Sequence, residues 1–216
     1  MISEDFKALS KVISREYGDV KVRRKYGWQN SSLNTIDCVL SLNRKYKGFV
    51  LPRVMEFQNK HPRMNDLEGL KRLIKRYEHP KDFLIDNLNY NDEKRSIVLL
   101  EVIKYLLFEQ KYYSGTTQYK RIQKWAKSVR PGDAYFTGIN GFGLSGFQYM
   151  RMLFGAQTVK PDVHIKNYIS TVLNRKVNDA FSLVLLEKVG KSLKIPLREL
   201  DNAIWKDLSN KNRTIS

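Results

Sequence analysis

Cysteine is almost absent from this chain, because Cys38 is the only one among 216 residues. A single cysteine excludes an intrachain disulfide framework and any metal site built from four cysteines. Cys38 lies in the apolar run from Ile36 to Leu42, where we expect it to be a small buried side chain. The three histidines form no pair with the spacing of zinc ligands, so no bound metal is predicted.

Long hydrophobic segments are absent as well. No apolar run reaches the ~18 residues that a membrane-spanning helix needs. The first residues, Met1 to Asp5, do not have the pattern of a signal peptide. We expect an intracellular protein, in the cytoplasm and nucleoid or in the nucleus, with no membrane contact.

Acidic residues are few compared with basic ones. The chain has 22 Asp and Glu against 39 Lys and Arg, which gives a formal net charge of +17. Such a charge favours binding to a polyanion, because binding releases the counterions condensed on it. Nucleic acid is therefore the expected partner, although charge alone indicates neither catalysis nor a choice between DNA and RNA.

Runs of alternating β-branched residues are scarce, and helical periodicity dominates the sequence instead. Pro80, Pro131, Pro161 and Pro196 fall at helix boundaries, where proline is best tolerated. The sequence thus predicts a compact all-α fold without internal repeats. The expected helices span residues 3–17, 32–43, 50–60, 66–76, 80–88, 91–109, 116–128, 143–154, 163–174, 179–193 and 196–209.

The segment from Ile139 to Ile169 carries most of the functional information. It contains a tight turn, Gly141-Phe142-Gly143, that opens an amphipathic helix, and a second helix begins at Asp162, 19 residues after Gly143. Glycines let a backbone approach an anion closely, and the amides of a helix N-terminus point at it. The turn is therefore predicted to bind a phosphate group, although a plain turn between helices is the alternative.

The sequence also matches the G-x-G-x-x-G pattern of dinucleotide sites, at Gly141, Gly143 and Gly146. Asp162 lies roughly where the acid that binds the ribose would follow. A dinucleotide fold needs a buried strand just before the first glycine and alternating strands and helices around it. The preceding residues, 131–138, lie between two expected helices. The pattern is therefore not the basis of our main prediction.

Two motifs in this segment resemble those of the helix-hairpin-helix DNA glycosylases, the superfamily of endonuclease III and the adenine glycosylases. Residues 139–143, Ile-Asn-Gly-Phe-Gly, are similar to their hairpin, usually Leu-Pro-Gly-Val-Gly, and residues 162–165, Asp-Val-His-Ile, to their Asp-Thr-His-Ile. Order and spacing agree over about 31 residues. The resemblance implies two helical lobes with a cleft between them, a hairpin that grips duplex DNA through Gly141, Phe142 and Gly143, and a catalytic aspartate, Asp162. It implies no metal or organic cofactor.

The departures from the family pattern narrow the expected activity. Ser145 stands where bifunctional members carry the lysine that attacks the sugar, and a serine cannot form the required Schiff base. The four-cysteine iron-sulfur loop is missing, and Asn140 replaces the hairpin proline. The resemblance therefore implies a monofunctional DNA glycosylase that removes a damaged or mismatched base without cleaving the strand.

Asp162 also has a structural interpretation. A carboxylate near the anomeric carbon can stabilise the positive charge that develops on deoxyribose, or orient the attacking water. An aspartate just before an apolar helical segment is, however, also an ordinary N-cap. The two roles are compatible, and His164, two residues on, is expected to be a structural hydrogen-bonding residue.

Several further residues are candidates for DNA contacts. Lys120 and Lys124 form part of a basic row before the hairpin, and Lys160 follows it, so backbone contact and simple solvation are both open for them. By resemblance, Asn43 occupies the position of the residue that fills the gap left by a flipped base. Trp28 is either an aromatic platform in the base pocket or part of the core.

By the same resemblance, residues 31–159 form a central lobe that ends in the hairpin, while residues 1–30 and 160–216 form a lobe from both termini. Two functional alternatives remain beside the glycosylase. One is a non-catalytic helix-hairpin-helix protein that binds DNA, and the other is a protein directed at RNA. A monomer is the simplest expectation, and the sequence does not identify the base removed.

Overall fold

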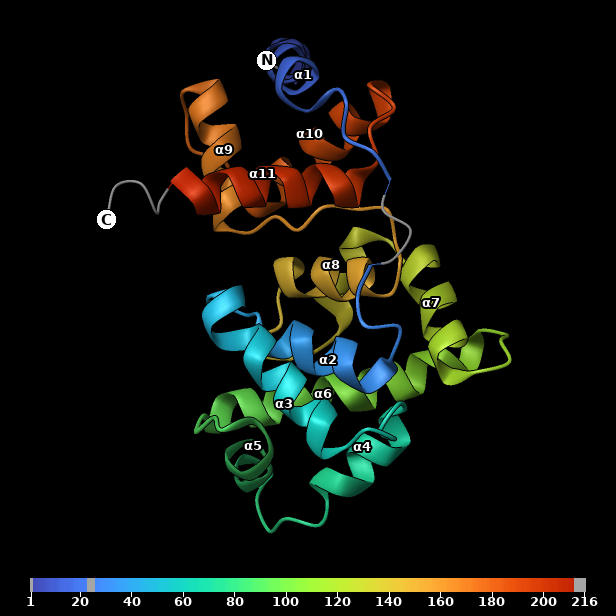
Figure 1. The fold of residues 1–216 in the computed structure, drawn as a ribbon. Helices are drawn as coiled ribbons and strands as arrows, with labels where there is room; N and C mark the ends of the chain where they lie inside the picture. Colours follow the sequence, from blue (N-terminus) through green and yellow to red (C-terminus); the bar gives the residue numbers. More distant parts are fainter. Residues whose placement is uncertain (1, 23–25, 212–216) are drawn as a thin grey trace. The chain divides into compact units, whose positions relative to one another are not determined.

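The computed structural model describes residues 2–22 and 26–211, and these residues form helices joined by turns, with no β-strand among them (Figure 1). The predicted all-α fold is thus confirmed. The chain divides into two compact units. One comprises residues 1–25 and 156–216, and the other comprises residues 26–155.

The unit built from both termini combines the first helix with the last three. Its helices are α1 (Ile2–Tyr17), α9 (Val163–Leu173), α10 (Asp179–Ser192) and α11 (Leu197–Lys211). Helix α1 buries Leu9, Ile13 and Tyr17 at helical spacing against α9 and α10. The Tyr17 hydroxyl also donates to Asp207 of α11, at 3.0 Å. The two ends of the chain therefore share one core.

The other unit is assembled around a buried helix, α2 (Ser31–Leu40), all of whose residues are buried. Around it lie the π-helical turn η1 (Tyr46–Val50), α3 (Leu51–Lys60), α4 (Leu67–Ile74), α5 (Pro80–Leu88), α6 (Glu93–Glu109), the 3₁₀ turn η2 (Gln110–Tyr112), α7 (Gln118–Ser128), the 3₁₀ helix η3 (Pro131–Phe136) and α8 (Leu144–Leu153). Helix α2 packs against α3, α4, α6, α7 and α8. It is the centre of this unit.

Asp37, at the middle of α2, is fully buried among four hydrogen-bond donors. Its carboxylate accepts from Trp28 Nε1 at 2.7 Å, from the hydroxyls of Tyr46 and Tyr149 at 2.9 Å each, and from Ser41 Oγ at 3.2 Å. Burial raises the pKa of Asp37, and these donors oppose the rise. The cluster ties α2 to the segment before it, to η1 and to α8.

The unit boundaries lie at residues 25/26 and 155/156, a few residues before the predicted ones at 30/31 and 159/160. Trp28 belongs with the central unit because it donates to Asp37, and Asn30 caps α2. Thr158 belongs with the terminal unit because its hydroxyl donates to Glu187 at 2.6 Å. Side-chain contacts of this kind, not the helix pattern, place the boundaries.

The predicted helices agree with the observed ones to within three residues at each end. Side chains cap six of them at the N-terminus, as short polar residues do: Asn30, Asp66, Asp92, Thr117, Asp162 and Asn178. The sequence pattern did not predict η1, η2 or η3, because elements this short have no resolvable period. Within the described part of the chain, none of the helices has the length and apolar character needed to cross a membrane.

Replacing Asp37 with alanine is expected to destabilise the protein by about 3 kcal/mol or more, because four buried or partly buried donors would lose their acceptor. Urea unfolding followed by tryptophan fluorescence measures the loss. Asp86→Ala, at an exposed aspartate of the same unit, is the control and should change the free energy of unfolding by less than ~0.5 kcal/mol. Equal effects of the two substitutions would contradict the central role of Asp37.

Candidate functional site

The predicted hairpin forms a tight turn that ends at the start of α8. The amide of Phe142 donates to the carbonyl of Ile139 at 3.2 Å, and Gly141 has a φ of +81°, a conformation that side chains other than glycine rarely adopt. The side chain of Phe142 is buried at 3% exposure. The ring of Phe142 is therefore not available to a ligand and anchors the turn to the core.

The N-terminus of α8 has no side-chain cap. Gly143 occupies the N-cap position, and no side chain hydrogen-bonds there. The first-turn amides, which include those of Leu144 and Ser145, have no acceptor within the helix, and the helix dipole makes this end positive. A Cβ added to Gly143 would meet nothing within 4 Å, so the space beside the turn is open. The turn therefore has the features of a backbone anion site.

The element before the turn is the six-residue 3₁₀ helix η3, and no strand precedes Gly141 among the described residues. A Cβ on Gly146 would lie 2.9 Å from Leu42 and 3.0 Å from the ring of Phe142, so this glycine serves close packing. The dinucleotide interpretation fails, since its buried strand is missing from the described residues.

Asp162 caps α9, as its structural interpretation predicted. Its Oδ1 accepts from the amides of His164 at 2.9 Å and Ile165 at 3.2 Å. Its Oδ2 takes no part in capping and lies 3.9 Å from Lys160 Nζ, with both side chains mostly buried, at 20% and 16% exposure. One carboxylate oxygen is thus structural, and the other faces a lysine.

Asp201 of α11 is a third member of this group, and sequence reasoning missed it. Its Oδ1 accepts from the backbone amide of Lys160 at 2.7 Å, and its side chain is buried. Burial, then the charge of Asp162, raise the pKa of Asp201 to about 8, while the amide and charge of Lys160 oppose the rise. The only signal in the sequence is that Asp201 falls among the apolar positions of its helix, beside Leu200 and four residues after Leu197.

Lys160, Asp162 and Asp201 therefore form a compact charged group in the terminal unit, which we call the aspartate pair with its lysine. A pair of carboxyl groups, one with a raised pKa and one held among hydrogen-bond donors, is a common arrangement for proton transfer. Among the described residues, no three His, Cys, Asp or Glu side chains are grouped as metal ligands. The chemistry this group can perform is that of an acid, a base or an electrostatic stabiliser.

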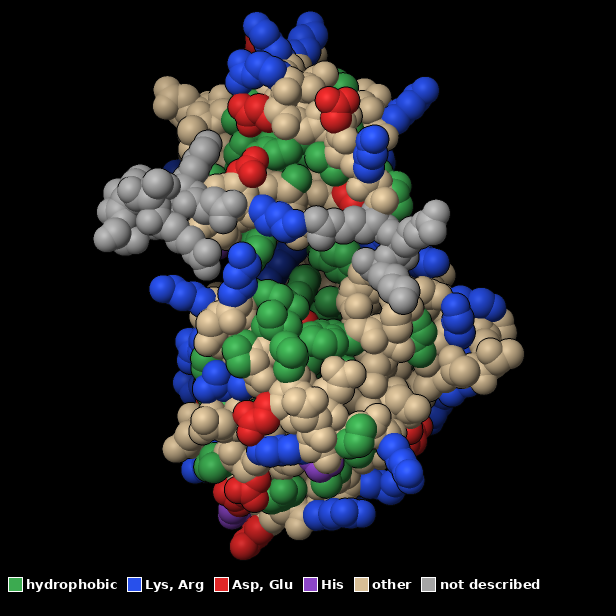
Figure 2. Space-filling model, viewed as in Figure 1, with side chains coloured by type: hydrophobic (Ala, Val, Ile, Leu, Met, Phe, Trp, Pro, Cys, Tyr) green, Lys and Arg blue, Asp and Glu red, His purple; other side chains and the backbone are tan. Residues whose placement is uncertain are grey.

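The remaining predicted site residues lie in the central unit. Ser145 is partly exposed in the first turn of α8, and Lys120 is exposed on α7. Lys124 donates to Ser114 Oγ at 2.8 Å, and Trp28 donates to Asp37, so its indole nitrogen is engaged in the core. Asn43 is exposed after α2 with a φ of +60°. Lys and Arg side chains are spread over the face drawn in Figure 2.

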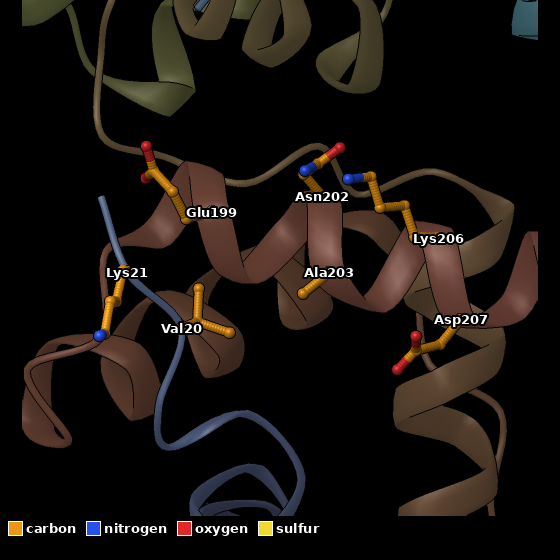
Figure 3. A pocket seen from close by; sticks show the side chains of 7 residues that line it. All are labelled: Val20, Lys21, Glu199, Asn202, Ala203, Lys206 and Asp207. Carbon is orange, nitrogen blue, oxygen red and sulfur yellow. The ribbon is translucent and has the colours of Figure 1, made fainter. Parts of the chain in front are cut away.

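None of the predicted site residues lines either of two surface cavities formed by the described residues. The one in the terminal unit, of about 300 Å³, lies between the segment after α1 and helix α11 (Figure 3). Its lining residues are Val20, Lys21, Glu199, Asn202, Ala203, Lys206 and Asp207. The one in the central unit, of about 250 Å³, is lined by His61, Met64, Gly69, Arg72, Leu73 and Arg76. The candidate site therefore rests on the hairpin and on the aspartate pair with its lysine.

A family model described as a domain of unknown function, DUF8548, matches residues 7–209. This match spans nearly the whole chain, which therefore belongs to that family. No curated protein and no solved structure matches the chain.

The stability of the protein is expected to fall as the pH rises from about 4 to 8. Folding raises the pKa of Asp201 from its ordinary value of 3.8 to about 8. The contribution of Asp201 to the free energy of unfolding is therefore complete below the pKa of 3.8 and is lost as the pH approaches the pKa of about 8. Asp201 contributes at most ~1.4 kcal/mol per pH unit to this slope, and Asp37, whose pKa burial also raises, adds to it in the same direction. Chemical denaturation at several pH values measures it.

Asp201→Asn removes one titrating group and should reduce this slope, while it keeps an oxygen that can accept from the amide of Lys160. Asp19→Asn, at an exposed aspartate in the same unit, should leave the slope as in the wild type. A wild-type pH dependence that persists unchanged in Asp201→Asn would show that another group causes it.

Proposed function

We propose that this member of the DUF8548 family is a monofunctional DNA glycosylase, which hydrolyses the N-glycosidic bond of a damaged or mismatched base flipped from duplex DNA. The observation that carries the proposal is the aspartate pair with its lysine, placed at the start of α9, where the resemblance to the glycosylases puts the catalytic aspartate. The uncapped N-terminus of α8 supports it, since it sits at the predicted DNA-binding hairpin.

Asp162 would carry the chemistry through Oδ2, the oxygen that capping does not use. As the bond between C1′ and the base nitrogen breaks, its electron pair leaves with the base and positive charge develops on the sugar. A carboxylate oxygen close to C1′ stabilises that charge, and it can accept a proton from the water that adds to C1′. The leaving base is protonated in turn, which completes the hydrolysis.

Lys160 and Asp201 would set the position of this carboxylate. The amide of Lys160 donates to Asp201, which fixes the backbone two residues before Asp162. The Lys160 ammonium, 3.9 Å from Oδ2, complements the negative charge. This arrangement would hold the reacting oxygen in one place while Oδ1 stays in the helix cap.

The hairpin would hold the DNA by a backbone phosphate. The amides of the first turn of α8 and the small Gly143 leave room for one phosphate group, which needs both positive potential and close approach. Ser145, at the position of the family lysine, provides no amine, so the proposed enzyme leaves an abasic site in an intact strand.

Asp162→Asn tests the catalytic role, since asparagine caps a helix about as well as aspartate. Release of free base should be measured on a panel of damaged and mismatched duplexes, followed by alkali cleavage of the abasic strand. The wild type should produce alkali-dependent breaks on at least one duplex, and Asp162→Asn should lower that rate about 100-fold or more with DNA affinity retained.

Asp66→Asn is the matched control, because Asp66 also caps a helix, α4, by accepting from the amide of Gly69. It should keep the wild-type rate. Equal base release by Asp162→Asn and the wild type would refute the catalytic assignment.

Gly143→Ala tests the hairpin. The added methyl group meets no protein atom within 4 Å but covers the space where a phosphate would approach the amides. Affinity for duplex DNA should fall about tenfold, as expected for the loss of a charged hydrogen bond. Fluorescence anisotropy measures it, and Gly48→Ala, at another glycine with no atom near its Cβ position, should bind as the wild type does.

A DNA-binding protein without catalysis is the second candidate, and the capping role of Asp162 Oδ1 favours it, since a cap alone would account for the aspartate. Undiminished duplex binding without base release on any duplex would select this candidate. Stronger binding to duplex RNA than to duplex DNA would instead select the RNA-directed alternative.

A further inference from the structure

Four aromatic side chains are exposed to solvent, and all lie within one stretch of the central unit. They are Phe108, Tyr112, Tyr135 and Phe136, with exposures of 54%, 69%, 70% and 85%. Other aromatic side chains of the described residues are buried or partly buried. Single exposed apolar side chains are common, but several of them gathered on one surface often mark an interaction site. We call these four residues the aromatic surface.

The two segments that carry the aromatic surface are connected through α7 and α8. Phe108 at the end of α6 and Tyr112 in η2 are one helical turn apart, and their ring centroids are 5.4 Å apart in a T-shaped contact. Turn η2 packs on α7, α7 packs on α8, and η3 packs on α8. The two pairs of exposed rings therefore belong to the same part of the central unit.

Helix η3 holds Tyr135 and Phe136 in place rather than presenting them on a loose loop. The backbone amide of Arg130 donates to Asp133 at 2.7 Å, which caps the first turn of η3. Ala134 is buried at 5% exposure, so the two residues after it face outward. Helix η3 also packs on α8. The exposed rings are thus fixed next to the hairpin.

The segment of the chain that carries the aromatic surface is strongly basic. Residues 104–136 contain seven basic and two acidic side chains, the latter being Glu109 and Asp133. The basic residues are Lys104, Lys111, Lys120, Arg121, Lys124, Lys127 and Arg130. Lys104 and Phe108 are four residues apart on α6 and both exposed, so a cation and a ring share one helix face.

We propose that the aromatic surface binds single-stranded DNA, with bases stacked on its rings and phosphates paired with the surrounding lysines. Aromatic side chains interleaved with cations are the general arrangement by which proteins bind unpaired nucleotides. The cores of protein–protein interfaces are depleted of lysine, so this charge pattern favours a polyanion over a protein partner. The surface ends three residues before Ile139, where the hairpin turn begins.

This inference goes beyond the proposed function, because stacking requires neither Asp162 nor base release. Only the choice of DNA over RNA rests on that function, since the hairpin is proposed to hold a DNA phosphate beside the same rings. A strand left unpaired next to the hairpin would reach the aromatic surface directly.

The test is the affinity of the full chain for a labelled oligothymidylate of about 20 nucleotides, measured by fluorescence anisotropy. The double variants Tyr135→Ser with Phe136→Ser and Phe108→Ser with Tyr112→Ser should each weaken binding by about tenfold or more. The salt dependence should be unchanged in both, because no cation is removed. Lys104→Ala with Lys111→Ala should instead reduce the salt dependence.

Ile85→Ser with Ile97→Ser is the matched control, since both isoleucines are exposed apolar residues of the same unit. It should bind as the wild type does. Wild-type affinity in both aromatic double variants would overturn the proposal. A dimer that dissociates only in these variants would also overturn it, because the surface would then bind a second copy of the chain. Tighter binding to oligouridylate than to oligothymidylate would overturn the choice of DNA.

The outcomes separate this inference from the glycosylase proposal. Loss of oligothymidylate binding in the aromatic variants, with no base release from any duplex by the wild type, would support the surface and refute the enzyme. Base release that depends on Asp162, with oligothymidylate binding unaffected by the aromatic variants, would support the enzyme and refute the surface.

Discussion

The buried carboxylate of Asp37 is the constraint on which the central unit depends. A charge at the middle of a buried helix is tolerated only when donors surround it, and here they come from before α2, from its end, from η1 and from α8. Since each donor must reach the same two oxygens, the cluster fixes how these elements pack. The position of α8, and with it that of the hairpin, follows from this requirement.

Much of the fold could be predicted from the sequence because its information is local. Helical periodicity and short polar caps place the helices, and they act over a few residues. The Asp37 cluster could not be found in this way, since Tyr149 lies 112 residues from its partner. The exposed rings of Tyr135 and Phe136 were hidden for a related reason, because only η3 and its cap determine that they face outward.

The candidate site was predictable to the same extent. The hairpin and Asp162 are marked by glycine spacing and by a short motif, so both could be chosen from the sequence. Asp201 could not, since its amide partner Lys160 lies 41 residues earlier and nothing local distinguishes an aspartate that will be buried. For Trp28, the sequence left a base platform and the core equally open, and the bond to Asp37 engages its indole nitrogen in the core.

Helix capping alone does not account for the surroundings of Asp162. Serine, threonine or asparagine would satisfy the amides of His164 and Ile165 as well, and none of them brings a charge. Yet a second carboxyl group, Asp201, is buried near enough for the charge of Asp162 to raise its pKa. A carboxyl group whose pKa is raised by folding lowers the stability of the folded state at neutral pH. Groups whose protonation is perturbed at the expense of stability gather at functional sites. The negative charge of Asp162, more than its role as a cap, is therefore the feature that favours a chemical function.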